Sequence, residues 1–198
     1  MHITQKLILL LKQILIPMIR YLNVFVLPCI YILACQQQHN TDKGMKLILP
    51  QNIEIYKPVK LNEPENANAS ANQLKIYTII DVSCATCLLK FEKWQAFKRE
   101  ISLFNNVKII PICISTDRFE TMKFLFENKK LPDISFALML DIDRRFLADN
   151  KKLVDGNNDL TVLVNTDNEV LLSGNPTENE ILKSDYLKVI GKKDIDKN

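Results

Sequence analysis

Histidine is almost absent from this sequence. The chain has 198 residues and two histidines, His2 and His39. Catalysis by a cysteine–histidine pair needs an imidazole beside the thiol, and mixed cysteine–histidine zinc sites need imidazole ligands. Because no histidine comes after His39, both kinds of site are excluded from the long C-terminal part of the chain.

Cysteine is scarce as well. Of the five cysteines, Cys29 and Cys35 lie in the N-terminal stretch, which leaves Cys84, Cys87 and Cys113 for the rest of the chain. Three is an odd number and too few for a disulfide framework. The chain beyond Cys35 is long enough for one domain with a full core, so disulfide staples are not needed for stability. The sequence therefore offers one pair of cysteines three positions apart and one separate thiol.

The chain also lacks a domain with an excess charge of one sign. Three of its 26 basic residues, Lys6, Lys12 and Arg20, lie in the first 34 positions, so 23 basic and 23 acidic residues remain after them. A near-neutral domain has no basic track for phosphate groups, and we expect no nucleic-acid partner. No internal repeat is visible.

The first 34 residues are apolar with a few basic residues, which is typical of an export signal. A short basic region at 18–20 precedes an apolar run, and polar residues come directly after Cys35. The ending Ile-Leu-Ala-Cys at positions 32–35 resembles the lipobox of bacterial lipoproteins, which implies a lipid on Cys35. The alternative is an uncleaved membrane anchor, since residues 7–34 are long enough to span a bilayer. Either interpretation places the rest of the chain outside the cytoplasm.

Apolar strand patterns and amphipathic helix patterns alternate along the remaining chain. Strands are predicted at 45–49, 52–56, 74–82, 107–115, 134–140, 160–165 and 169–173, and helices at 85–104, from 117 onward, at 141–150 and at 177–187. The predicted division is a signal peptide at 1–34, an acylated terminus with polar linker and short strands at 35–72, a domain at 73–190 and a polar tail at 191–198.

Cys84 and Cys87 stand where the strand at 74–82 passes into a helix. In the first turn of a helix, unpaired backbone N–H groups and the positive end of the helix dipole favour a thiolate. Cys84 is therefore predicted to attack a substrate disulfide and Cys87 to resolve the mixed disulfide. The alternatives are a structural disulfide or two inert thiols.

Two further side chains near this pair have open roles. Asp81 is the only carboxylate in the preceding strand and a candidate acid for proton transfer to Cys87; the alternative is a strand-end residue that hydrogen-bonds a loop. Cys113 is expected to be a buried, apolar-like residue of a central strand, or else a third ligand in a metal site.

The order of elements over residues 74–187 resembles the thioredoxin-like arrangement. Residues 136–143 and 160–170 also resemble the corresponding stretches of TlpA/ResA-type envelope thiol-disulfide oxidoreductases, which are commonly anchored by a signal or a lipid. The resemblance implies an α/β, three-layer fold with a central mixed sheet flanked by helices. It also implies a redox-active Cys84–Cys87 disulfide, with no other cofactor and no metal.

Several positions depart from that family's pattern. Ser83 stands where the family has an aromatic residue, and Thr78 at the position of its buried acid. Leu160, followed by Thr161, stands where the family has the cis-proline of its substrate-facing loop. A cis peptide without proline costs about 3–4 kcal/mol, so we expect a trans bond at Leu160.

These features predict a lipid-anchored thiol-disulfide oxidoreductase of the bacterial cell envelope that acts on protein thiols and disulfides. Two alternatives remain. One is a thioredoxin-like binding module without catalysis, and the other is a Cu(I) or zinc carrier that uses Cys84, Cys87 and optionally Cys113.

Overall fold

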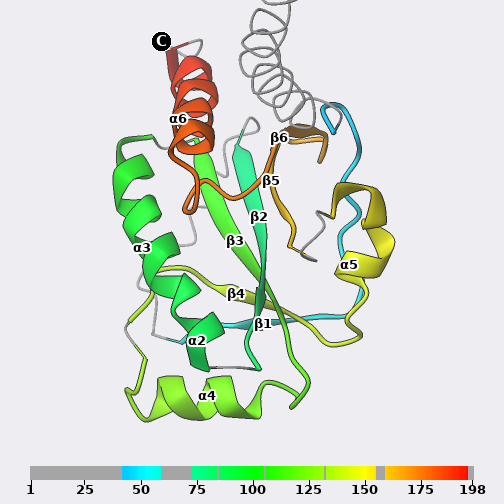
Figure 1. The fold of residues 1–198 in the computed structure, drawn as a ribbon, viewed down its shortest axis with the longest axis vertical. Helices are drawn as coiled ribbons and strands as arrows, with labels where there is room; N and C mark the ends of the chain where they lie inside the picture. The colour runs from blue at the N-terminus through cyan, green and yellow to red at the C-terminus, as the bar shows by residue number, and fades with distance from the viewer. Residues whose placement is uncertain are drawn as a thin grey trace, which may run out of the picture. The chain divides into compact units, whose positions relative to one another are not determined.

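A six-stranded mixed sheet forms the centre of the fold (Figure 1). Its strands are β1 (Ile53–Tyr56), β2 (Leu74–Asp81), β3 (Val107–Ile114), β4 (Leu138–Asp141), β5 (Thr161–Val164) and β6 (Val170–Ser173), in the order β1-β4-β3-β2-β5-β6. β2, β3 and β4 are parallel, whereas β1, β5 and β6 run antiparallel to their neighbours. The computed structural model describes residues 42–58, 73–83, 85–104, 106–131, 133–154 and 159–195. The predicted signal, Cys35, the linker at 62–72 and Cys84 lie outside these residues.

Helices cover both faces of this sheet. They are α2 (Ala85–Leu88), α3 (Lys90–Glu100) with the 3₁₀ turn η1 (Ile101–Leu103), α4 (Glu120–Glu127), α5 (Phe146–Asp149) with η2 (Lys151–Leu153), and α6 (Glu180–Ile195). In Figure 1, α3 and α6 lie on one side of the central strands and α5 on the other. The architecture is the predicted thioredoxin-like α/β fold. Within the described ranges, no helix is both long and apolar enough to cross a bilayer.

Alternate residues of β2 build the two apolar layers. Ile76 and Ile80 pack in one buried cluster with side chains of α3, α4 and α6, while Tyr77 and Ile79 pack in the other with Phe146 of α5. A strand covered on both faces reads as a continuous apolar run, because successive side chains point to opposite faces. This double burial holds the carboxyl end of β2, where the cysteine pair begins, in a fixed position.

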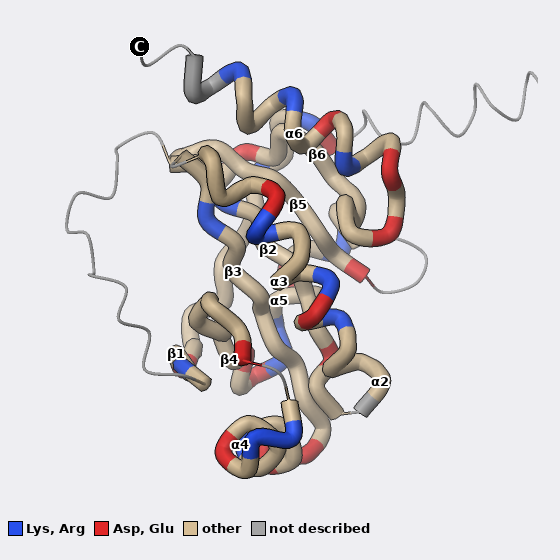
Figure 2. Tube along the Cα trace, turned by 90° about the vertical axis from the view of Figure 1, so that its left-hand side faces the viewer, with Lys and Arg blue, Asp and Glu red and all other residues tan. Residues whose placement is uncertain are grey.

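Charged residues of both signs are interspersed along the described elements (Figure 2). Several of them join elements that are distant in sequence. Lys123 of α4 pairs with Glu54 of β1 at 2.8 Å, and Lys183 of α6 pairs with Glu100 of α3 at 2.8 Å. This mixture is the distribution expected from the equal numbers of basic and acidic residues after position 34.

The segment before β1 is attached at the start of β6 by a few backbone hydrogen bonds and one isolated bridge, not by a continuous strand ladder. The backbone N–H of Gly44 donates to the carbonyl of Val170 (2.8 Å), and Lys46 forms an isolated bridge with Glu169. The strand predicted at 45–49 is therefore wrong, whereas the one at 52–56 is confirmed as β1, which pairs with β4.

Two other elements differ in extent from the prediction. β4 covers only residues 138–141, because Ile134 and Phe136 are buried by packing without joining the sheet. The helix predicted at 177–187 begins at Glu180 and continues to Ile195, so the expected polar tail is helical at 191–195. Ile190, beyond the predicted end of the helix, is fully buried, so core packing continues past that end.

Asp117 fixes the start of α4. Its carboxylate accepts the N–H groups of Phe119 (3.1 Å) and Thr121 (3.0 Å) and the hydroxyl of Ser115. The Ser115 hydrogen bond, and then the bonds from Thr121, lower the pKa of Asp117 to about 2. The helix begins at Glu120, later than predicted, because Arg118 (φ 58°) and Phe119 (φ 69°) adopt left-handed conformations.

Replacement of Asp117 by alanine is expected to lower the free energy of unfolding by about 0.5–2 kcal/mol at pH 7, the usual range for a lost cap. A depressed folded-state pKa stabilises above the unfolded-state pKa near 4, and that stability is lost as pH falls toward 2. Urea unfolding at pH 7 and pH 2.5 should show the difference shrinking at the lower pH. The exposed Asp133→Ala variant is the control, and an equal cost for both variants would contradict the capping role.

Candidate redox site

Cys87 lies in α2, the helical turn that comes after β2. It is partly buried and disulfide-bonded. Cys113 is a free thiol, so the sulfur bonded to Cys87 belongs to a cysteine outside the described residues. Cys84, three positions earlier, remains the predicted partner.

The helix that carries Cys87 is anchored in the core. The single helix predicted at 85–104 is divided into α2 and α3 by a turn at Leu89. There the N–H of Leu89 donates to the carbonyl of Thr86 (3.3 Å), a three-residue spacing that marks a tightened turn. Phe91 and Trp94, four and seven residues after Cys87, are fully buried. The short first turn therefore rests on a helix whose apolar face is fixed against the sheet.

Asp81 and Ser83 connect the loops beside the cysteine pair. The carboxylate of Asp81 is exposed and accepts the N–H of Ser83 (2.9 Å), and the hydroxyl of Ser83 accepts the N–H of Thr116 (2.8 Å). These bonds join the loops after β2 and β3, the two parallel strands whose carboxyl ends meet here. Asp81 thus makes the hydrogen bond to a loop that is expected of a polar residue at the end of a strand. A role in proton transfer stays a prediction.

A pair of hydroxyl groups occupies the place beneath the site where the resembled family has its buried acid. Thr78 of β2 is 1% exposed and Thr161 of β5 is 4% exposed, and their Oγ1 atoms are 2.9 Å apart. The two residues are also register partners in the antiparallel β2–β5 ladder. Neither hydroxyl titrates near neutral pH, so proton transfer to Cys87 needs another group or water.

Thr78→Val is expected to lower the free energy of unfolding by about 1–3 kcal/mol, because it leaves the buried Thr161 hydroxyl without its partner. Thr161→Val should have a similar cost for the same reason. In the double variant both hydroxyls are gone, so the cost should be clearly below the sum of the two. Urea unfolding of the four proteins measures this coupling, and additive costs would contradict it.

Leu160 marks the start of the site's other wall. The bond between Asp159 and Leu160 is trans, since the described residues contain no cis peptide bond. Leu160 is 1% exposed, and its carbonyl accepts the N–H of Ile79 (2.9 Å). The side chains of both Leu160 and Thr161 are buried, so any substrate contact at this position would involve backbone atoms or neighbouring side chains.

An ion pair joins this wall to the cysteine-bearing helix. Nζ of Lys90, three residues after Cys87, lies 3.4 Å from a carboxylate oxygen of Asp159, immediately before Leu160. Lys90 is the first residue of α3, directly after the turn at Leu89. Lys93 and Glu178 form a second, looser pair at 3.8 Å. Lys90 belongs to the stretch that carries the cysteine pair, whereas Asp159 lies far from it in sequence, so their proximity depends on the fold.

A groove lies at the carboxyl ends of β2 and β3 beside this ion pair, with a volume of about 540 Å³. Its floor and sides combine apolar and charged side chains: Ile79, Asp81, Lys90, Ile114, Arg144, Leu147, Asp159 and Glu178. Such a mixed lining suits an extended polypeptide better than a small apolar ligand.

Cys113 is fully buried in β3, as expected, with Ile80 and Leu140 as its register partners. Burial raises the pKa of its thiol well above the ordinary value, so it is a poor nucleophile in the folded protein. In the part of the chain that the structure describes, no three histidine, cysteine or carboxylate side chains are arranged to hold a metal ion.

Comparison with known proteins gives structural matches only. No family model and no curated protein matches the chain. A protein assigned as the thiol:disulfide interchange protein DsbE of Chlorobium tepidum is 16% identical, with 60% of this chain and 80% of that chain covered and a TM-score of 0.47. A thiol:disulfide interchange protein from Bacteroides sp. is 11% identical, with 61% of this chain and 75% of that chain covered and a TM-score of 0.43. The thioredoxin domain of a thiol-disulfide oxidoreductase from Bacteroides vulgatus is 15% identical, with 60% of this chain and 79% of that chain covered and a TM-score of 0.42.

Proposed function

We propose that this protein is a thiol-disulfide oxidoreductase that works through Cys84 and Cys87. The observation that carries the proposal is the disulfide-bonded Cys87 in the turn after β2, within a sheet of thioredoxin-like order. Helix-start N–H groups stabilise a thiolate at this place, and a fold with two full apolar layers does not depend on a staple.

The exchange has two steps. The Cys84 thiolate attacks one sulfur of a substrate disulfide, which forms a mixed disulfide and releases the other substrate sulfur as a thiolate. The Cys87 thiolate then attacks the Cys84 sulfur, which closes the protein disulfide and releases the second substrate thiolate. The substrate is reduced by two electrons and the protein pair is oxidised by two; the reverse sequence oxidises a dithiol.

The pair is expected to be mildly reducing. Ala85 and Thr86 bring no positive charge, and the nearest lysine on the helix, Lys90, is paired with Asp159. Without an additional cation the thiolate gains little beyond the helix-start N–H groups, so the potential should lie nearer to about −270 mV than to about −120 mV.

The N-terminal sequence suggests the location and the partners. A lipid on Cys35 would hold the domain at the surface of a membrane in the bacterial cell envelope, and the polar residues that directly follow Cys35 would connect it to that surface. Its substrates would then be thiols and disulfides of other envelope proteins. Mass spectrometry of the protein isolated from bacterial membranes tests the anchor: a diacyl or triacyl mass on Cys35 is expected, and an intact residue 1–34 segment would contradict it.

Titration in glutathione buffers tests the exchange. The full-length chain is equilibrated over a range of potentials, and alkylation of free thiols is followed at each. A two-electron transition of the Cys84–Cys87 pair with a Cys84 pKa below about 8.5 is expected. An unreactive pair would contradict the proposal and leave a binding module, and stoichiometric copper or zinc on the reduced protein would favour a carrier. Cys84→Ser is the control that must lose the transition.

A further inference from the structure

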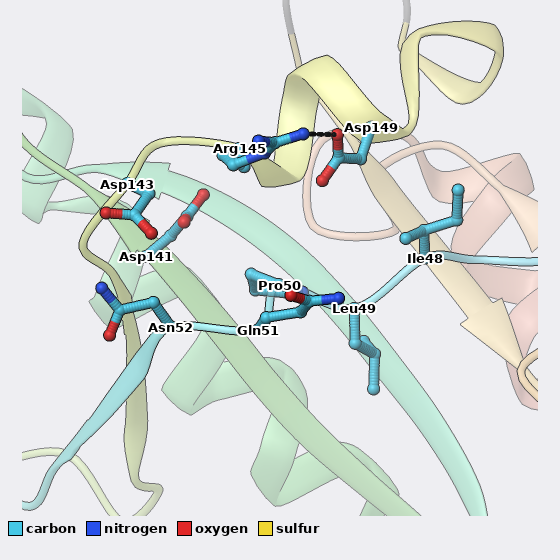
Figure 3. Close-up of a pocket in the computed structure, with 9 residues that line it drawn as sticks. All are labelled: Ile48, Leu49, Pro50, Gln51, Asn52, Asp141, Asp143, Arg145 and Asp149. Carbon is cyan, nitrogen blue, oxygen red and sulfur yellow. Dashed lines mark hydrogen bonds and ion pairs between the residues drawn. The ribbon is translucent and has the colours of Figure 1, made fainter.

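A second cavity lies away from the cysteines, between the segment before β1, the end of β4 and α5 (Figure 3). Its volume is about 230 Å³. It is lined by Ile48, Leu49, Pro50, Gln51, Asn52, Asp141, Asp143, Arg145 and Asp149. None of these residues lines the groove beside the Lys90–Asp159 ion pair, so the cavity has no part in the proposed exchange reaction.

Asp141 is the unusual residue of this cavity. Its side chain is fully buried at the end of β4, and one carboxylate oxygen accepts the N–H of Phe146 (2.8 Å). The other, Oδ1, is buried and has no hydrogen-bond partner among the described residues. In Figure 3 the carboxylate points into the space between Asp143, Arg145 and Gln51. A buried carboxylate oxygen without a partner costs several kcal/mol, so a positively charged ligand at this point would relieve a real penalty.

The cavity has more negative than positive charge. Its lining contains three aspartates and one cation, Arg145, whose guanidinium pairs with Asp149 at 3.2 Å. Within the part of the chain that the structure describes, neither Asp141 nor Asp143 forms an ion pair. Figure 3 shows the side-chain amides of Asn52 and Gln51 among the side chains that line the cavity. The available ligand atoms are thus two carboxylates, neutral amide oxygens and backbone carbonyls, all of them oxygens.

We propose that this cavity binds one Ca²⁺ ion through Asp141 and Asp143, with amide oxygens of Gln51 or Asn52 and water as further ligands. Ca²⁺ accepts six to eight oxygen ligands in irregular geometry and tolerates amide and water ligands, whereas Mg²⁺ requires a near-ideal octahedron. A site with two carboxylates and the guanidinium of Arg145 nearby is weak. Its dissociation constant should therefore fall at about 10⁻⁴–10⁻³ M, the range of extracellular calcium modules.

The bound ion would connect two parts of the chain that are far apart in sequence. Gln51 and Asn52 precede β1, whereas Asp141 and Asp143 lie at the end of β4 and just after it. Asn150 already joins these parts, because its side-chain amide accepts the N–H of Ile48 and donates to the Ile48 carbonyl (2.8 Å each). A ligand that binds only the folded state raises its stability by mass action. Calcium should therefore stabilise the attachment of the segment before β1.

Calorimetric titration of the chelator-treated, full-length chain with CaCl₂, alongside MgCl₂, tests the site. We expect saturable binding of one Ca²⁺, a higher melting temperature with Ca²⁺, and at least about tenfold weaker binding of Mg²⁺. No calcium-dependent heat and no change in melting up to about 10 mM would overturn the proposal. Equal binding of the two ions would overturn the choice of calcium.

Variants on the exposed side of the cavity separate a site from nonspecific attraction without disturbing the buried Asp141. Asp143→Asn removes one ligand charge and should weaken Ca²⁺ binding by about tenfold or more. Arg145→Gln removes the opposing cation and should strengthen it several-fold. Asp133→Asn, an equal charge change outside the cavity, should leave it unaltered. Binding that is the same in all three variants would overturn the assignment, whatever the exchange activity of the cysteines.

Discussion

Replacement of Cys84 by serine is expected to abolish disulfide exchange, with a loss of at least about 10³-fold in the rate of reduction of an aromatic disulfide. The physical reason is the loss of the only attacking thiolate, since a serine hydroxyl is not ionised at neutral pH. The rate is measured from the coloured thiolate that the substrate releases, with the reduced full-length protein in excess.

Cys87→Ser should behave differently, and this difference identifies the roles of the two sulfurs. The Cys84 thiolate remains and can attack, but the mixed disulfide has no internal thiol to resolve it. A covalent adduct between protein and substrate should therefore accumulate and be visible by mass spectrometry.

Cys113→Ala is the matched control. The residue is fully buried in β3 and outside the predicted chemistry, so the variant should exchange disulfides at the rate of the unmodified protein. An adduct in Cys84→Ser and none in Cys87→Ser would reverse the proposed order of attack.

The central strands could be predicted because a run of consecutive apolar residues is enough to indicate a buried strand. The apolar-rich residues at 74–82 predict a buried strand, and β2 covers all but the last of them. The ends of elements depend on partners elsewhere in the chain. Ile134 and Phe136 have the pattern of a strand but pair with no neighbouring strand among the described residues, and α6 extends beyond its predicted end at Leu187, where Ile190 is buried in the core.

In the candidate site, too, the features carried by consecutive residues could be predicted, and the contacts between distant residues could not. The spacing of Cys84 and Cys87 between a strand and a helix is a property of one continuous stretch, residues 74–94, and it predicted the placement of Cys87. The Thr78–Thr161 hydroxyl pair joins residues 83 positions apart, and the Lys90–Asp159 ion pair joins residues 69 apart. No sequence period relates such residues, so only the sheet register and helix position reveal them.

These long-range contacts change the expected chemistry. A buried carboxylate beneath the cysteines would accept the proton that the Cys87 thiol must lose before it attacks, and its negative charge would disfavour the thiolate; the neutral pair of Thr78 and Thr161 does neither. The absence of that charge favours the thiolate at the site slightly, while the lack of a buried proton acceptor should make deprotonation of Cys87 in the resolving step depend on water. Exchange is therefore expected to be rapid in attack and slower in resolution.

Trp94→Ala is expected to lower the free energy of unfolding by about 3–5 kcal/mol, the largest stability effect of any substitution considered. Trp94, the chain's one tryptophan, is fully buried in the cluster under α3 and packs edge-on against Phe97 at 5.8 Å between ring centroids. Alanine would leave a cavity that helix and sheet cannot close, because both are held by other core residues. Urea unfolding followed by circular dichroism measures the effect, since the variant has no tryptophan fluorescence.

Trp94→Phe separates lost packing from lost polarity. The indole Nε1 is buried without a hydrogen-bond partner among the described residues, a penalty of about 1–3 kcal/mol that phenylalanine removes. This gain offsets most of the smaller cavity, so the net cost should stay below about 1.5 kcal/mol. Trp94 fixes α3 against the core, and α3 directly follows the turn that carries Cys87. The alanine variant should therefore loosen that turn and slow exchange, whereas the phenylalanine variant should not. Equal destabilisation by alanine and phenylalanine would show that the indole N–H is satisfied in solution and that the packing around Trp94 is not what holds the cysteine-bearing turn.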